Sequence, residues 1–204
     1  PEAYEQEYKT CKRFLTGLLD STLLVLSGQD LVTSCVLRLV EEIRNRTKIT
    51  VLYVMPDIEM LPKVPSMHER MIRGVLQQYA RSGLLNSMYI MSNEEICSFL
   101  PYYSIEDMYD NINEAIVNVF ENVIFYLNEK PMLGSHHEAK DVSRIRTVEY
   151  GDFNENKKNV YFPLDNVTET CYINIVSNED MKNNRELLDL LKGMIKENTE
   201  NNIL

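Results

Sequence analysis

The chain has 204 residues, of which 44% are hydrophobic and 25% are charged, and its formal net charge is −10. This length can bury the core of one globular domain or two small ones. A general nucleic-acid binder needs a basic footprint, so the acidic balance excludes that class and equally excludes binding to an anionic membrane surface. No apolar run is long enough to span a membrane, and no secretion signal opens the chain.

The four cysteines are far apart in the sequence and form no CxxC pair; they are Cys11, Cys35, Cys97 and Cys171. A chain of this size does not depend on a disulfide framework to fold. We therefore expect reduced thiols and a cytoplasmic location.

In the first half of the chain, short apolar runs alternate with amphipathic segments. The apolar runs have the composition of strands buried on both faces of a parallel sheet, and they cover residues 21–28, 49–55 and 84–92. Helical spacing is found over residues 4–20, 33–46 and 66–82, and a brief helix follows Ser92. In the third of these segments the residues expected to face the core are Met67, Met71, Val75, Leu76 and Tyr79. The alternation predicts an α/β domain with right-handed crossovers.

The strongest helical signal runs from Ser104 to Leu127, where apolar residues recur at steps of three and four. Ser104 followed by Asp107 is typical of a helix start, and the helix would be about 36 Å long. Its last turns, VIFYL, are apolar nearly all round, so we expect them to be buried. Near its start, Tyr109 and Asn113 lie one turn apart. This ring and amide could pack within the core, or they could stack on and read a flat heterocycle.

After this helix the chain becomes more polar, with a loop over 128–140 and a turn-rich connector over 151–159. Residues 141–150 are expected to end extended, and residues 170–176 have the composition of a strand. Residues 183–195 form an amphipathic helical pattern. The predicted organisation is an α/β domain (1–103), a linking helix (104–127) and a smaller α+β domain (128–204).

Two stretches could carry chemistry. The turn after the first strand, SGQDLVTS (27–34), is where a parallel sheet would hold a phosphate, but its one glycine is Gly28. Thr33 or Ser34 could instead cap the next helix. In the loop, His136, His137 and Glu138 are adjacent and Asp141 follows. They could bind a metal, the two acids could polarise a water, or the loop could simply be exposed.

The order of elements resembles the tubulin/FtsZ superfamily of GTP-dependent filament proteins, over nearly the whole chain. NSMYIMSNEEI is similar to the FtsZ pattern of a strand, "(I/P)N(D/E)KL" and a helix. CYINIVSNEDM is similar to the FtsZ strand, "GxEDL" and amphipathic helix. HHEAKDV, after the long helix, is similar to "NxDFADV", with His136 in place of Asn.

The resemblance implies a GTPase-type half-domain joined by the central helix to an activation-type domain. Tyr109 would stack on guanine and Asn113 would hydrogen-bond to it, while Gly28, Thr33 and Ser34 would lie at the phosphates. It implies that Glu138 and Asp141 complete hydrolysis in the next subunit of a head-to-tail filament. GTP or GDP would be the cofactor, with Mg²⁺ accompanying the nucleotide. The partner would be a second copy or a related subunit.

Two departures from the family leave two functions open. The family's "GGGTGTG" turn is replaced by SGQDLVTS, and the opening strands with the first phosphate loop are missing ahead of Pro1. Either residues precede Pro1 in the natural protein, or the chain is a trimmed relative that pairs with something. A sheet without those strands would expose an apolar edge. The resemblance thus implies either a self-associating protein of this type with weak or lost GTPase activity, or a non-catalytic structural or protein-interaction module.

Overall fold

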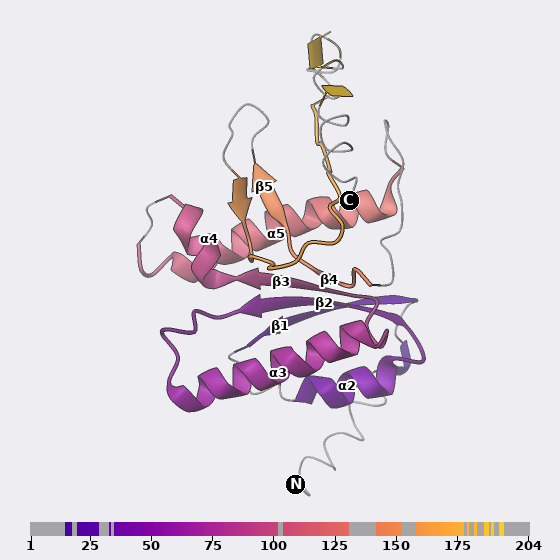
Figure 1. The fold of residues 1–204 in the computed structure, drawn as a ribbon, viewed down its shortest axis with the longest axis vertical. Coiled ribbons are helices and arrows are strands. Elements are labelled where there is room, and N and C mark those ends of the chain that lie inside the picture. The colour runs from indigo at the N-terminus through magenta and orange to yellow at the C-terminus, as the bar shows by residue number, and fades with distance from the viewer. Residues whose placement is uncertain are drawn as a thin grey trace, which may run out of the picture.

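The computed structural model describes residues 15–17, 20–28, 33, 35–101, 104–130, 142–151 and 158–177, with single residues from 179 to 193. Its centre is a four-stranded sheet with helices on both faces (Figure 1). The helices α2 (Val36–Ile43) and α3 (Lys63–Arg81) cover one face. The helices α4 (Asn93–Phe99) and α5 (Met108–Asn128) lie over the other. The fold is therefore α/β, as the sequence predicts.

All four strands are parallel, in the order β1-β2-β3-β4. They are β1 (Ser21–Ser27), β2 (Lys48–Met55), β3 (Ser87–Ser92) and β4 (Ile145–Arg146). The first three match the predicted apolar runs. The fourth comes from beyond α5 and pairs Met88 with Ile145, so a piece of the predicted C-terminal region extends the first sheet.

Each face of the sheet has its own hydrophobic core. Under α2 and α3 the core includes Val40, Leu76 and Ile90, together with Leu15 of the short 3-10 helix η1 (Leu15–Gly17). Under α4 and α5 it includes aromatic side chains; Tyr89 and Phe120 meet edge-to-face with ring centroids 5.2 Å apart. Such pairs stabilise a core beyond the area they bury.

The strand β1 departs from the prediction that it is buried on both faces. Its even-numbered leucines face α2 and α3, but Leu23 and Val25 point to the opposite face, where Val25 is 62% exposed. Within the described residues β1 pairs only with β2, so its other edge is open. Composition predicted the strand correctly but not its place at the edge of the sheet, where Leu23 and Val25 are exposed.

Three helix predictions need correction. The long helix begins at Met108 and not at Ser104, because Ser104 forms a turn with Asp107: its hydroxyl donates to that carboxylate over 2.5 Å. The last turns are buried only at Val123, since Ile124, Phe125 and Leu127 are exposed, Phe125 by 68%. Met67 and Met71 do not face the core; they are 58% and 59% exposed. The side of α3 that meets the sheet carries Glu69, Ile72, Leu76 and Ala80 instead.

The chain after α5 forms a small hairpin of β5 (Glu149–Gly151) and β6 (Lys158–Val160). The buried Tyr161 attaches this region to the sheet: its carbonyl accepts from the Ser92 N–H (2.7 Å) and its hydroxyl donates to the Ala115 carbonyl (3.2 Å). Residues 170–176 form no strand, contrary to prediction, and most of the predicted helix 183–195 lies outside the described residues. In the described part of the chain no helix has both the length and the apolarity to cross a membrane.

Truncation of a side chain to alanine should destabilise the protein more in the core under α3 than on the exposed face of β1. Leu76 is fully buried, so Leu76→Ala should lower the free energy of unfolding by about 2–5 kcal/mol. Leu23→Ala makes the same chemical change on the open face and should cost about 1 kcal/mol. Urea unfolding of both variants checks this. Equal losses would mean that the face of β1 carrying Leu23 is covered in solution.

Candidate functional site

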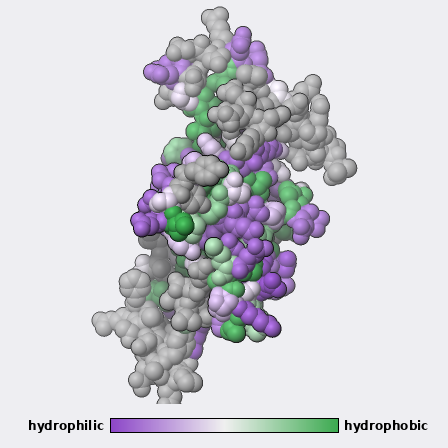
Figure 2. Space-filling model, turned by 90° about the vertical axis from the view of Figure 1, so that its left-hand side faces the viewer, coloured by the Kyte–Doolittle hydropathy of each residue, from purple (hydrophilic) through white to green (hydrophobic). Residues whose placement is uncertain are grey.

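The carboxyl ends of the parallel strands are where α/β sheets hold their ligands. Here that edge carries Gly28 after β1, Pro56 after β2 and Asn93 after β3. Figure 2 views the molecule from this side and shows small hydrophobic patches among hydrophilic side chains. The predicted nucleotide site should therefore lie at this edge.

Side chains of neighbouring elements pack closely against Gly28. The Gly28 N–H donates to the Val54 carbonyl over 3.1 Å, which holds the turn against β2. A Cβ at Gly28 would lie 2.6 Å from the Tyr53 hydroxyl and 2.9 Å from both Glu69 Cγ and Pro56 Cδ. The glycine is needed for this close internal packing. Since a phosphate must approach a backbone N–H directly, the occupied space leaves no cradle at Gly28.

Thr33 also serves the turn internally. Its side chain is buried, and its hydroxyl donates to the Ser27 carbonyl over 2.6 Å. It does not cap α2, whose N-cap residue is Cys35, with no side-chain capping bond. Ser34, the other predicted phosphate contact, lies outside the described residues.

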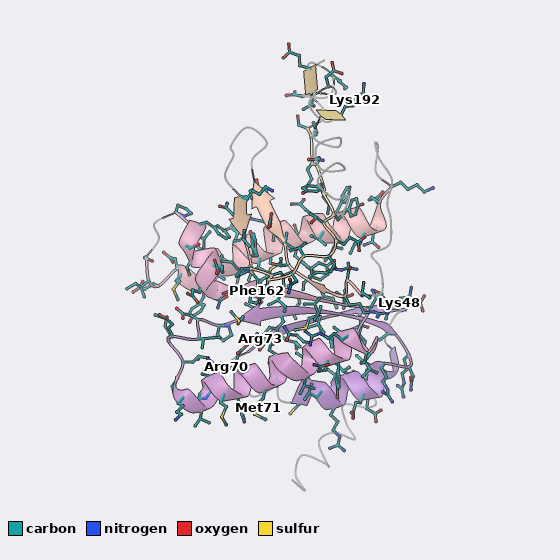
Figure 3. All side chains as sticks on the ribbon, viewed as in Figure 1. Lys48, Arg70, Met71, Arg73, Phe162 and Lys192 are labelled. Atoms are coloured by element: carbon teal, nitrogen blue, oxygen red, sulfur yellow. The ribbon has the colours of Figure 1, made fainter. Side chains whose placement is uncertain are left out.

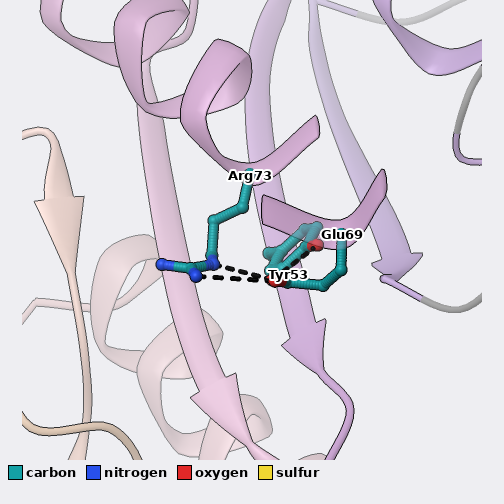
Figure 4. Close-up of polar contacts among 3 residues, drawn as sticks. All are labelled: Tyr53, Glu69 and Arg73. Carbon is teal, nitrogen blue, oxygen red and sulfur yellow. Dashed lines mark hydrogen bonds and ion pairs between the residues drawn. The ribbon is translucent and has the colours of Figure 1, made fainter. Parts of the chain in front are cut away.

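Beneath the turn lies a buried polar cluster of Tyr53, Glu69 and Arg73 (Figure 4). Glu69 is completely buried on α3. Its Oε1 accepts from the Tyr53 hydroxyl (3.2 Å) and from Arg73 Nε (2.7 Å), and its Oε2 is 3.5 Å from Arg73 Nη2. A buried carboxylate needs such partners because desolvation of an unpaired charge is costly. The cluster joins α3 to β2 and lies against Gly28.

Burial raises the pKa of the Tyr53 phenol well above its usual value, and the charge and hydrogen bond of Glu69 raise it further. The cation of Arg73 lowers this pKa by less. The phenol therefore stays protonated and donates to Glu69.

Sequence reasoning missed this cluster. The signal that could have found it is the pair Glu69 and Arg73, four residues apart on a helix, with the acid at a position where the periodicity requires a core residue. Acids are rarely fully buried unless they are paired, so an acid at a core position predicts a nearby cation.

Tyr109 and Asn113 are both exposed, Tyr109 by 53%. Tyr109 borders a small hollow with a volume of about 30 Å³, lined also by Asp57, Met60, Asn93, Glu94, Cys97, Met108 and Ile112. Ligand pockets typically measure about 300–1,000 Å³. The described residues therefore bring Tyr109, but not Asn113, to a hollow that is too small for a purine base.

The predicted catalytic pair, Glu138 and Asp141, lies outside the described residues, as do His136 and His137. Within the described part of the chain, no group of three or more His, Cys, Asp or Glu side chains could hold a metal ion. Cys35, Cys97 and Cys171 are free thiols.

Comparison of the chain with protein-family models, with curated proteins and with solved structures gives no match. The likeness to the tubulin/FtsZ superfamily therefore rests on the order of the elements and on the motifs quoted above. The fold is compatible with a half-domain of the Rossmann type, because its sheet is parallel and covered by helices on both faces.

Removal of Arg73 tests the buried cluster. Arg73→Ala leaves the Glu69 carboxylate buried without its cation, so we expect the free energy of unfolding to fall by about 3 kcal/mol. The matched control is Arg70→Ala on the same helix, where the side chain is exposed and the loss should stay within about 0.5 kcal/mol. Denaturant unfolding measures both, and similar losses would contradict a stabilising role for the pair.

The raised pKa of Tyr53 predicts a dependence of stability on alkaline pH. The folded state holds the phenolic proton more tightly than the unfolded state, so its stabilisation is complete below about pH 10 and is lost as the pH rises toward the folded pKa. In Tyr53→Phe this contribution is absent, so its free energy of unfolding should fall less steeply between about pH 10 and pH 11. Parallel slopes for the two proteins would show that Tyr53 does not titrate differently on folding.

Proposed function

We propose that this chain is a non-catalytic relative of the tubulin/FtsZ proteins, a structural module that associates head-to-tail with copies of itself or with a related subunit. Its fold would be a GTPase-type half-domain joined by α5 to a smaller activation-type domain. We place it in the cytoplasm, which suits the free thiols of Cys35, Cys97 and Cys171.

The closed turn at Gly28 carries the proposal. A triphosphate needs open backbone N–H groups and a positive local potential at a helix start. In this chain the Gly28 N–H already donates to the Val54 carbonyl, and Tyr53, Glu69 and Pro56 pack so closely against Gly28 that no Cβ would fit there. The described part of the turn is thus held by contacts within the protein, and the Gly28 N–H is not open to a phosphate.

The edge of β1 away from β2, with which no described residue pairs, supports the interaction role. An unpaired strand edge presents backbone hydrogen-bonding groups, and proteins usually protect such edges with charges or prolines. The sequence STLLVLS of β1 has neither, and Leu23 and Val25 are exposed beside it. An uncharged edge of this kind favours contact with another polypeptide.

A GTP-dependent filament protein is the second candidate. It is favoured by Tyr109, which borders the hollow at the carboxyl edge together with Asn93, whose buried Oδ1 has no hydrogen-bond partner among the described residues. In that case Tyr109 and Asn113 would hold the base, Mg²⁺ would accompany the nucleotide, and Glu138 and Asp141 would act on GTP in a neighbouring subunit.

Nucleotide binding and assembly, measured together, separate the two candidates. For the purified chain with Mg²⁺ we expect no binding of a fluorescent GTP analogue, no phosphate release, and light scattering that rises with protein concentration equally with and without GTP. Asp141→Ala should leave the scattering unchanged. GTP-dependent scattering with turnover that Asp141→Ala abolishes would overturn the non-catalytic proposal in favour of the GTPase.

A further inference from the structure

The outer face of α3 combines exposed apolar and basic side chains. Val64, Met67 and Met71 share the side of the helix away from the sheet, and Figure 3 shows Met71 pointing outward while Arg73 lies on the sheet side. The exposed cations Lys63, Arg70 and Arg81 accompany them. The one acid of α3, Glu69, is buried. This helix therefore presents a basic, methionine-lined surface in a chain of net charge −10.

Gly74 lies in the middle of α3, and the fold does not explain it. No atom lies within 4 Å of the position its Cβ would take, and its φ is not positive. Glycine in a helix interior is destabilising relative to alanine. A glycine there becomes useful when a second helix crosses α3 closely, because a missing side chain lets two backbones approach.

The outer face of α5 has the opposite character. From residue 104 to residue 129 every charged side chain is acidic. Asp110, Glu114 and Glu121 are exposed and follow one another along the helix, with the exposed Val117 and Phe125 beside them. α5 and α3 lie on opposite faces of the sheet (Figure 1).

We propose that the basic, methionine-lined face of α3 in one copy docks on the acidic face of α5 in the next copy. This inference rests on the proposed self-association and names the surfaces that perform it. Complementary charge selects the orientation, and the flexible methionines adapt to Val117 and Phe125. Because the two surfaces differ and lie on opposite faces of the sheet, each added copy leaves a free α3 and a free α5, which gives an open chain of subunits.

A charge-reversal exchange tests the contact. One variant carries Lys63→Glu with Arg70→Glu on α3, and the other carries Asp110→Lys with Glu114→Lys on α5. Each alone should associate about tenfold more weakly than the unchanged chain in sedimentation velocity, because like charges then face each other. An equimolar mixture should recover association, since each variant then meets an opposite charge. Arg46→Glu with Lys48→Glu changes the same charge at exposed positions elsewhere and should have no effect.

Gly74→Ala supplies an independent readout that a folding defect cannot imitate. It should raise the thermal unfolding midpoint, because alanine favours the helix and meets nothing in the fold. The same substitution should weaken association about tenfold, because the added methyl group separates the crossing helices. A more stable protein with unchanged association would overturn the proposed crossing at α3.

The remaining outcomes distinguish failure of the α3–α5 contact from failure of the proposed function. If the unchanged chain stays monomeric at every concentration, the proposed self-association itself fails. If it associates but neither charge variant differs from the control, the α3–α5 contact is wrong and the proposed function stands. If the α3 variant instead loses binding to vesicles of anionic phospholipid while association is unchanged, the face of α3 serves a membrane surface and the contact is overturned.

Discussion

The carboxylate of Glu69 is the constraint on which the carboxyl edge of the sheet depends. It is fully buried, so it must be held by the Tyr53 hydroxyl and the Arg73 guanidinium, and these bonds set the position of α3 over β2. Its methylene group also packs against the turn at Gly28, where no larger residue would fit. The same residue therefore stabilises the packing of α3 on the sheet and determines that position 28, at the carboxyl edge, must be glycine.

The arrangement separates the molecule into a closed site and two contrasting surfaces. In the described part of the turn after β1, the Gly28 N–H donates to the Val54 carbonyl and the Thr33 hydroxyl donates to the Ser27 carbonyl, so these groups are engaged within the protein. In contrast, the outer faces of α3 and α5 and the open side of β1 present apolar groups to solvent. Large exposed apolar side chains grouped on one surface are more typical of association than of an isolated monomer.

Much of the fold could be predicted because the strands and helices have clear local patterns. The apolar runs ending near Ser27, Met55 and Ser92 are strands, and Ser92 caps α4 by accepting from the Glu95 N–H, as its sequence indicates. What failed depends on contacts between distant segments. An apolar strand can have the same composition at the centre and at the edge of a sheet, so the exposure of Val25 could not be predicted from the sequence.

The site was harder to predict than the fold, for a related reason. Met67 and Met71 fit a core stripe as well as Ile72 and Leu76 do, and only the orientation of α3 decides which stripe is buried. Glu69 was missed because a buried acid depends on Tyr53, a partner on another element. Tyr109 and Asn113 were correctly placed near the start of α5, but periodicity does not reveal that the hollow beside Tyr109, among the described residues, is smaller than a nucleotide.

The sequential order of the sheet also has a consequence for how the protein folds. β1, β2 and β3 are neighbours both along the chain and in the sheet, so each pairing closes a short loop at a small cost in entropy. β4 is different, because pairing Ile145 with Met88 encloses all of α4 and α5 and contributes two residues of strand. A strand of two residues adds few hydrogen bonds to offset the entropy of closing that longer segment. The α5 face of the sheet is thus complete only once the C-terminal region has docked.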